Sequence, residues 1–144
     1  MLDKNKKYVG YCPEEQDFVQ GTLVDGLLKH NVLGKEVTAT TYDLVCENCG
    51  AFLSSHEVER ENEIIVYDSY KKIVGLLTST EIKNIRNKRK WSQRQLAKFL
   101  DIGEKDITRY ENGAIQTRSI DNMIRLVGDD AVFERMCVCL NKNV

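Results

Sequence analysis

Residues 92–113 decide how the C-terminal half of this chain folds, and they read SQRQLAKFLDIGEKDITRYENG. The serine that opens this stretch is a good helix N-cap, so we predict a helix over residues 93–100. Residues 101–103 predict a tight turn, and a second helix follows over residues 104–112 until the closing glycine ends it. Two short helices joined by a three-residue turn that contains glycine are typical of a helix-turn-helix motif.

Apolar residues at helical spacing predict how these two helices pack. Leu96, Leu100, Ile102 and Ile107 form a wedge between the helices. Ala97 is small at the place where the helices must approach each other closely. This pattern therefore predicts one shared core for the two helices and the turn between them.

Three further helices flank this motif. Thr78 and Glu81 have the spacing of a capping box and predict the start of the first one. The other two are predicted over residues 119–128 and 130–141. Together with the motif they predict an all-α domain of five helices over residues 76–144.

Charge is distributed unevenly along the chain. The formal net charge is only −1, but residues 83–118 contain ten basic and four acidic residues, a net charge of +6. Residues 1–75 carry eight basic and thirteen acidic residues (net −5), whereas residues 76–144 carry thirteen and nine (net +4). We infer two modules of opposite sign, of which the C-terminal one suits a polyanionic partner.

The second helix of the motif is the element expected to read DNA, because its exposed start enters the major groove in proteins of this plan. Arg109 suits a bidentate contact to guanine O6 and N7, while the start of the first helix is placed for backbone phosphate. The candidate DNA-binding residues are Gln93, Arg94, Lys105, Asp106, Thr108, Arg109 and Asn112. The competing interpretation is an ordinary helical bundle with a solvated basic face.

The composition describes an ordered globular chain. Its 144 residues are 42% hydrophobic and 30% charged, with a single proline. No apolar run approaches the roughly 20 residues of a membrane span, and no apolar stretch follows the N-terminal lysines. We therefore expect a cytoplasmic protein that is neither secreted nor inserted in a membrane.

Three of the five cysteines have the spacing of a metal site. Cys46 and Cys49 form a C-x-x-C followed by Gly50, which is the shape of a zinc knuckle, and Cys12 lies upstream of them. The residue three places after Cys12 is Glu15, where a second knuckle would have a cysteine. Three thiolates and one carboxylate are a permitted donor set for a structural Zn²⁺ ion.

Other interpretations of the cysteines remain open. His30 or His56 is an alternative fourth ligand, and without a metal the thiols would pack as small apolar groups. A redox role is less favoured because the C-x-x-C lacks a βαβ setting. Cys137 and Cys139 point to different faces of a helix; we expect at least one to be buried near a dimer contact and assign neither to a metal.

The N-terminal half is predicted as short antiparallel strands, most clearly over residues 18–24 and 36–45. A helix follows from residue 57 to about Val74, opened by a capping box from Ser54 to Glu57. The predicted fold class is α+β. It comprises a zinc-knuckle-like antiparallel β domain over residues 1–56, a connecting helix over residues 57–75, and the helical domain.

The helix-turn-helix motif and the helices around it resemble a known family. Residues 78–128, above all the segments SQRQLA and ITRYENG, are similar to the Xre-type helix-turn-helix family. The resemblance implies that Tyr110 packs against the domain and that Glu111 steadies the loop after the recognition helix. It also implies that Lys105 and Arg109 occupy base-reading positions.

The whole chain resembles MqsA-type antitoxins, in which a YgiT-type zinc-finger domain precedes an Xre-type domain. This resemblance places Cys12, Cys46 and Cys49 at three zinc-ligand positions and Glu15 at the fourth. It implies a homodimer that represses its own operon at a palindromic DNA site and binds a protein toxin through the N-terminal domain.

Two alternatives come from other classes of function. One is a phage or mobile-element regulator of the same architecture without a toxin partner. The other is an enzyme, which we do not expect: the chain has only His30 and His56, and it has no phosphate loop and no HExxH pattern.

Overall fold

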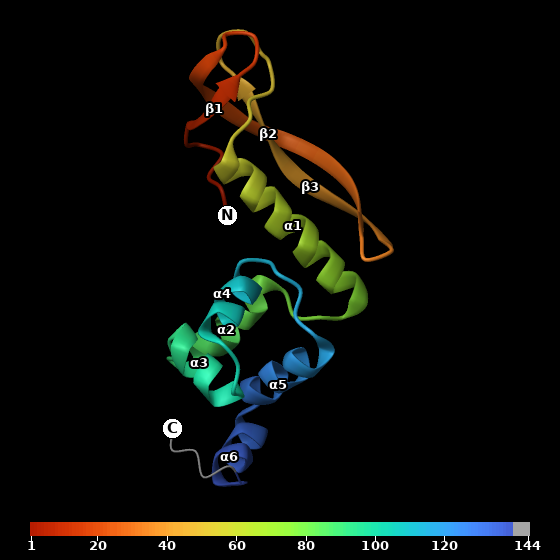
Figure 1. The fold of residues 1–144 in the computed structure, drawn as a ribbon, viewed down its shortest axis with the longest axis vertical. Helices are drawn as coiled ribbons and strands as arrows, with labels where there is room; N and C mark the ends of the chain where they lie inside the picture. Colours follow the sequence, from red (N-terminus) through yellow and green to blue (C-terminus); the bar gives the residue numbers. More distant parts are fainter. Residues whose placement is uncertain (140–144) are drawn as a thin grey trace. The chain divides into compact units, whose positions relative to one another are not determined.

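The computed structural model describes residues 1–139, which form two compact units, Met1–Tyr70 and the residues from Lys71 onward. Over the described residues the chain has three antiparallel strands followed by six helices, which confirms the predicted α+β class (Figure 1). The long helix α1 (His56–Val74) begins in the first unit and ends in the second. The division at residues 56 and 75 stays a prediction.

The sheet has the order β1 (Tyr8–Cys12), β2 (Asp17–Val32), β3 (Lys35–Cys46). The prediction of short strands was wrong for β2, which is 16 residues long and contains Gly21 and Gly26 in its interior.

Neighbouring groups occupy the space of a side chain at both glycines: the Val45 backbone and the Leu53 side chain at Gly21, and the end of the Asp43 side chain alone at Gly26. A Cβ at Gly21 would lie 2.7 Å from Leu53 Cδ1, and a Cβ at Gly26 would lie 2.6 Å from Asp43 Oδ2. Glycine in a strand interior often marks such a close approach and does not end the strand.

A two-residue loop joins β2 to β3. Leu33 and Gly34 both have positive φ angles, of 49° and 82°, and Val32 pairs with Lys35 on either side of them. Two successive positive φ angles are typical of a type I′ turn, whose twist matches that of the flanking strands. The pairing then continues without interruption to Gly21 and Cys46.

A short segment after β3 contacts the outer edges of both β1 and β3. Ser54 exchanges backbone hydrogen bonds with Tyr11 (2.9 and 3.1 Å), and Leu53 N–H donates to Leu44 O (2.8 Å). The predicted capping box from Ser54 is therefore wrong: Ser54 is engaged in this β-bridge, and helix α1 starts at His56. The core of this unit contains Tyr8, Cys12, Leu23, Leu44, Cys46, Leu53 and Val58.

Helix α1 is attached to the sheet through one asparagine. Asn62 Oδ1 accepts from Tyr42 N–H (2.8 Å), and its Nδ2 donates to Tyr42 O (2.7 Å). Since Tyr42 lies in β3, this side chain satisfies the backbone groups on the outer side of that edge strand, away from its neighbour Asp25 in β2.

The second unit contains the five helices predicted for the C-terminal part. They are α2 (Ser79–Lys88), α3 (Gln93–Leu100), α4 (Glu104–Glu111), α5 (Arg118–Gly128) and α6 (Asp130–Cys139). The predicted end of the last helix at residue 141 lies outside the described residues. Within residues 1–139, no helix has both the length and the apolar character needed to cross a membrane.

Local signals set most of these helix ends. Thr78 forms the predicted capping box with Glu81, and Ser92 forms a second one with Gln95. The buried core of the unit comprises Leu77, Ile82, Leu96, Ala97, Phe99, Leu100, Ile107, Ile124, Val127 and Phe133. The predicted wedge between α3 and α4 is confirmed, with Ile102 partly buried at its rim.

Candidate metal centre and nucleic-acid interface

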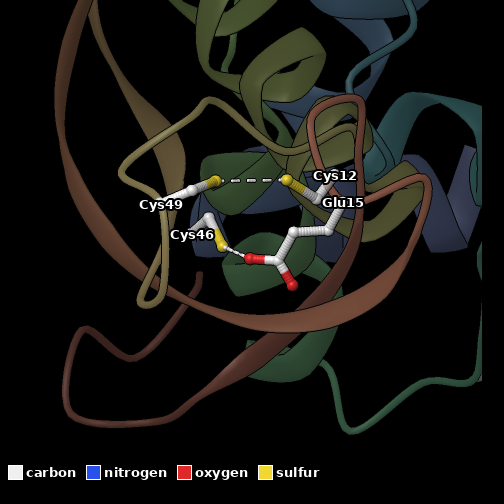
Figure 2. Close-up of side chains that lie close together, drawn as sticks. All are labelled: Cys12, Glu15, Cys46 and Cys49. Atoms are coloured by element: carbon white, nitrogen blue, oxygen red, sulfur yellow. Dashed lines mark hydrogen bonds between the residues drawn. The ribbon is translucent and has the colours of Figure 1, made fainter.

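The four candidate metal ligands come together at one end of the sheet. Cys12 ends β1, Cys46 ends β3, and Glu15 and Cys49 lie in the turns that follow these strands (Figure 2). One ligand atom from each residue lies within 4.8 Å of every other. Cys12 Sγ is 3.4 Å from Cys49 Sγ, and Cys46 Sγ is 3.3 Å from Glu15 Oε1.

This geometry fits a tetrahedral ion. Ligand atoms about 2.3 Å from such an ion lie about 3.7 Å apart, which is close to both of these spacings. Three sulfurs and one oxygen are compatible with structural zinc. Neither histidine belongs to the cluster, so Glu15 is the fourth candidate ligand that the structure supports.

The loop that carries Cys49 is held from several sides. Gly50 follows it with a φ of +76° and donates its N–H to Cys46 O, which turns the chain under the candidate site. Glu47 of the same loop accepts from Thr22 Oγ1 (2.8 Å) and pairs with Lys7. Asn48 Nδ2 donates to the outer oxygen of Glu15 (3.2 Å). These contacts hold the Cys49 loop and the Glu15 carboxylate at the candidate site.

The pKa values of Cys12 and Cys49 are shifted in opposite directions. Burial raises the pKa of Cys12, but hydrogen bonds from the Glu15 and Glu14 backbone and from Cys49 outweigh it and leave the pKa below its ordinary value. A hydrogen bond from the Ala51 backbone lowers the pKa of Cys49, but contacts with Cys12 and Cys46 together with burial raise it to about 11. A metal ion must therefore displace a proton at Cys49.

The remaining two cysteines lie far along the chain in α6. Cys137 is half-buried against the helical core and Cys139 is exposed, so the prediction that at least one is buried is met only in part, by Cys137. Whether this helix lies near a dimer contact stays a prediction.

The helix-turn-helix geometry is present as predicted. Helices α3 and α4 are joined by residues 101–103, where Asp101 adopts the left-handed conformation (φ 54°) and Ile102 N–H donates to Ala97 O. Gly103 is the N-cap of α4 and has no side chain to cover the helix start. The Asp106 carboxylate lies beside this helix start, with Oδ2 3.1 Å from the position that a Cβ on Gly103 would take.

Three of the seven candidate DNA-binding side chains share the exposed surface of α4. Lys105 and Arg109 are one helical turn apart, and Asn112 follows three residues later at the C-cap. The Arg109 side chain is 71% exposed, and its ion pair with Asp106 is long, at 3.7 Å. Arg94 is exposed in the first turn of α3, as the prediction of a phosphate contact requires.

Gln93 and Thr108 are engaged within the protein. Thr108 Oγ1 donates to Gln93 Oε1 (2.8 Å), and Gln93 Nε2 donates to Glu111 Oε2 (2.8 Å). Both side chains are half-buried. A DNA contact by either residue stays a prediction; in the free protein they connect α3 to α4.

Glu111 is the centre of this network. Its carboxylate accepts from Arg86 Nε (2.5 Å) and Nη2 (2.9 Å), and Arg86 Nη1 also donates to Trp91 O. The role implied by the family resemblance is corrected here: Glu111 fixes α4 to α2 and α3, and its hydrogen bonds do not reach the loop after α4. Tyr110 packs against the core, as the resemblance implied.

The environment of Glu111 favours its charged form. Burial raises the pKa of Glu111, but hydrogen bonds from Arg86 and Gln93 outweigh it and hold the pKa below its ordinary value of 4.5. No local sequence pattern indicates this network, because Arg86 and Glu111 are 25 residues apart.

The basic excess of residues 83–118 divides into two groups. Arg89 donates to Val127 O and stacks on Phe133, Lys88 pairs with Asp130, and Arg118 donates to the backbone of Val74 and Gly75. These residues, like Arg86, are engaged in contacts within the helical unit. The other basic side chains are exposed and remain available for a polyanion; they are Lys83, Lys90, Arg94, Lys98, Lys105 and Arg109.

Comparison with known families agrees with this geometry. Residues 82–127, about a third of the chain, match a family model described as helix-turn-helix. No curated protein and no solved structure matches the chain. The match supports a DNA-binding transcription regulator, and it covers the segment in which Lys105 and Arg109 are exposed.

Proposed function

We propose that this chain is a sequence-specific transcriptional repressor that acts as the antitoxin of a type II toxin–antitoxin pair. The observation that carries the proposal is the construction of α4. Its inner side is fixed by Glu111, while Lys105 and Arg109 project from its exposed surface. Such a rigid helix with free basic side chains can present Arg109 to a guanine edge.

The chain acts as a homodimer in this proposal and represses its own operon. Two copies of α4 then read a palindromic site whose halves are about 34–36 Å apart. The helix-turn-helix match and the exposed basic side chains support DNA binding, and the resemblance to MqsA-type antitoxins supports the dimer and the autoregulation.

The N-terminal unit binds the protein toxin in this proposal, with zinc as a structural ion. Residues 1–70 contain thirteen acidic and six basic residues, a net charge of −7, which suits a basic partner. The ion would be held by Cys12, Glu15, Cys46 and Cys49, where it would fix the ends of β1 and β3. The proposed role is binding throughout, with no catalytic activity of this chain.

The first experiment measures binding of the full chain to the DNA upstream of its own gene at two salt concentrations. We expect tight binding that weakens steeply with salt, because phosphate contacts release counterions. Arg109→Ala should cost about 1–3 kcal/mol and relax specificity at one base position. Arg60→Ala removes the same side chain from the other unit and serves as the control. Wild-type affinity in Arg109→Ala would contradict the placement of the recognition helix.

A second experiment tests the toxin partner. The chain is co-expressed with the product of the gene next to its own, and both growth and complex formation are measured. Growth arrest by the neighbour alone, relieved by a complex with this chain, is the expected result. Specific DNA binding with no toxic neighbour would favour the regulator of a phage or mobile element.

A further inference from the structure

Strand β2 has an open outer edge along residues 22–32, which are eleven of its 16 residues. Strand β1 pairs only with Asp17–Gly21 of β2, whereas β3 pairs with β2 as far as Val32. In the described part of the chain, no strand continues β1 alongside residues 22–32 of β2. Such an edge is a ready template for another strand.

The hydrogen bonds of β3 show which N–H and C=O groups of β2 point toward the open edge. Tyr42 in β3 lies opposite Asp25, and both its N–H and its C=O are bonded to Asn62. Asp25 is therefore not the hydrogen-bonded partner of Tyr42, and its own N–H and C=O face the open edge. By the alternation of an antiparallel ladder, the same holds for Leu27, Lys29 and Asn31.

The side chains along this edge are self-complementary. Consider a second copy whose β2 pairs antiparallel with this edge, so that Leu27 of one copy lies opposite Leu27 of the other. In this register Asp25 of each copy lies opposite Lys29 of the other. The Leu27 side chain is 69% exposed and would be covered by its own counterpart. The Asp25 carboxylate is 63% exposed and contacts Lys4 Nζ through one oxygen (2.5 Å), which leaves the other oxygen for a lysine across the interface.

We propose that the outer edge of β2 binds the same edge of a second copy of this chain, as an antiparallel pair centred on Leu27. The interface lies in the N-terminal unit and is independent of the proposed DNA-binding function and of any dimer contact made by the helical unit. It is isologous, as expected for a symmetric dimer.

Charge decides both the register and the strength of this contact. Centring the pair on position 28 would place Leu27 opposite Lys29 and Asp25 opposite Asn31, and both ion pairs would be lost. The N-terminal unit of each copy carries a net charge of −7, so the two copies repel each other. Repulsion between charges more than about 8–10 Å apart is largely screened at physiological salt. Neighbouring charges across the strand pair therefore dominate.

The test is disulfide trapping in the full chain with oxidised glutathione, in a zinc-loaded background that carries Cys137→Ser and Cys139→Ser. Leu27→Cys places two thiols at a hydrogen-bonded pair, where Cα atoms about 5.5 Å apart permit a disulfide. Thr38→Cys is the matched control, because Thr38 is exposed, lies opposite Lys29 and faces the other edge of the hairpin. Mass spectrometry identifies the disulfide that joins the same position of two copies.

We expect position 27 to be trapped about tenfold faster than position 38, the scale set by two favourable cross-strand charge pairs. Adding Lys29→Glu to Leu27→Cys sets two like-charge pairs across the interface and should slow trapping about tenfold. Adding Asp25→Lys as well restores opposite charges and should restore the rate. Equal trapping at positions 27 and 38 overturns the proposal, and so does a charge swap that fails to rescue.

Discussion

Glu111→Gln tests whether α4 is fixed from its inner side. The substitution keeps the shape of the side chain but removes the charge that faces Arg86, whose own side chain is 15% exposed. Removing one partner of a buried ion pair costs about 3–5 kcal/mol, because the other charge stays buried without compensation. Since Arg86 keeps some access to water, we expect a loss of about 3 kcal/mol in the free energy of unfolding of the helical unit.

Thermal unfolding followed by circular dichroism measures this loss. For a unit of 60–100 residues, 1 kcal/mol shifts the melting temperature by about 4–8 °C, so the expected shift is about 12–24 °C. Asp130→Asn is the control, because Asp130 pairs with Lys88 and Arg89 but is 65% exposed, and such surface pairs contribute about 0–1 kcal/mol. If Glu111→Gln costs no more than Asp130→Asn, Glu111 does not fix α4 as we argue.

Cys46→Ser should reduce the zinc-to-protein ratio from about one to near zero, as measured by elemental analysis, because it removes one of the ligands of a four-coordinate site. Glu15→Cys should strengthen zinc binding in a chelator competition, since a thiolate is the softer ligand; unchanged affinity would remove Glu15 from the site. Ile107→Ala should cost about 2–5 kcal/mol in denaturant unfolding, because Ile107 is fully buried between α3 and α4. Burial raises the pKa of Asp121, but hydrogen bonds from the Leu77 backbone, Arg125 and Gln116 outweigh it, so its folded-state pKa lies below 3.8. The stability due to this carboxylate is therefore present above pH 3.8 and lost as the pH falls through the folded-state pKa. Asp121→Asn should reduce the change of the melting temperature with pH over that acid range.

The helical unit was largely predictable because its signals are local. Capping boxes at Thr78 and Ser92, the glycine at the turn and apolar spacing each act within a few residues, so one sequence is enough to place the helices. The candidate metal ligands were predictable for a related reason. The spacing of Cys46 and Cys49 and the offset of Glu15 from Cys12 each lie within one turn of the chain.

The long strand β2 and the network of Glu111 could not be predicted in this way. Gly26 favours a strand break when it is considered alone, and only the pairing of β2 with β3 as far as Val32 shows that the strand continues through it. Arg86 looked like one more basic residue of a DNA-binding surface. Its burial against Glu111 depends on the packing of α2 against α4, which no local pattern encodes.

The two candidate sites share one principle of construction. In each, the groups offered to a ligand are held by polar contacts between residues far apart in the sequence: Glu47 with Thr22 and Lys7 at the metal ligands, and Arg86 with Glu111 at α4. At α4 this has a consequence for recognition. A bidentate arginine contact to a base requires a fixed helix, so a change that loosens Glu111 should weaken discrimination between DNA sequences more than it weakens phosphate-mediated, non-specific binding. Specificity of the regulator would then depend on a buried carboxylate that never touches DNA.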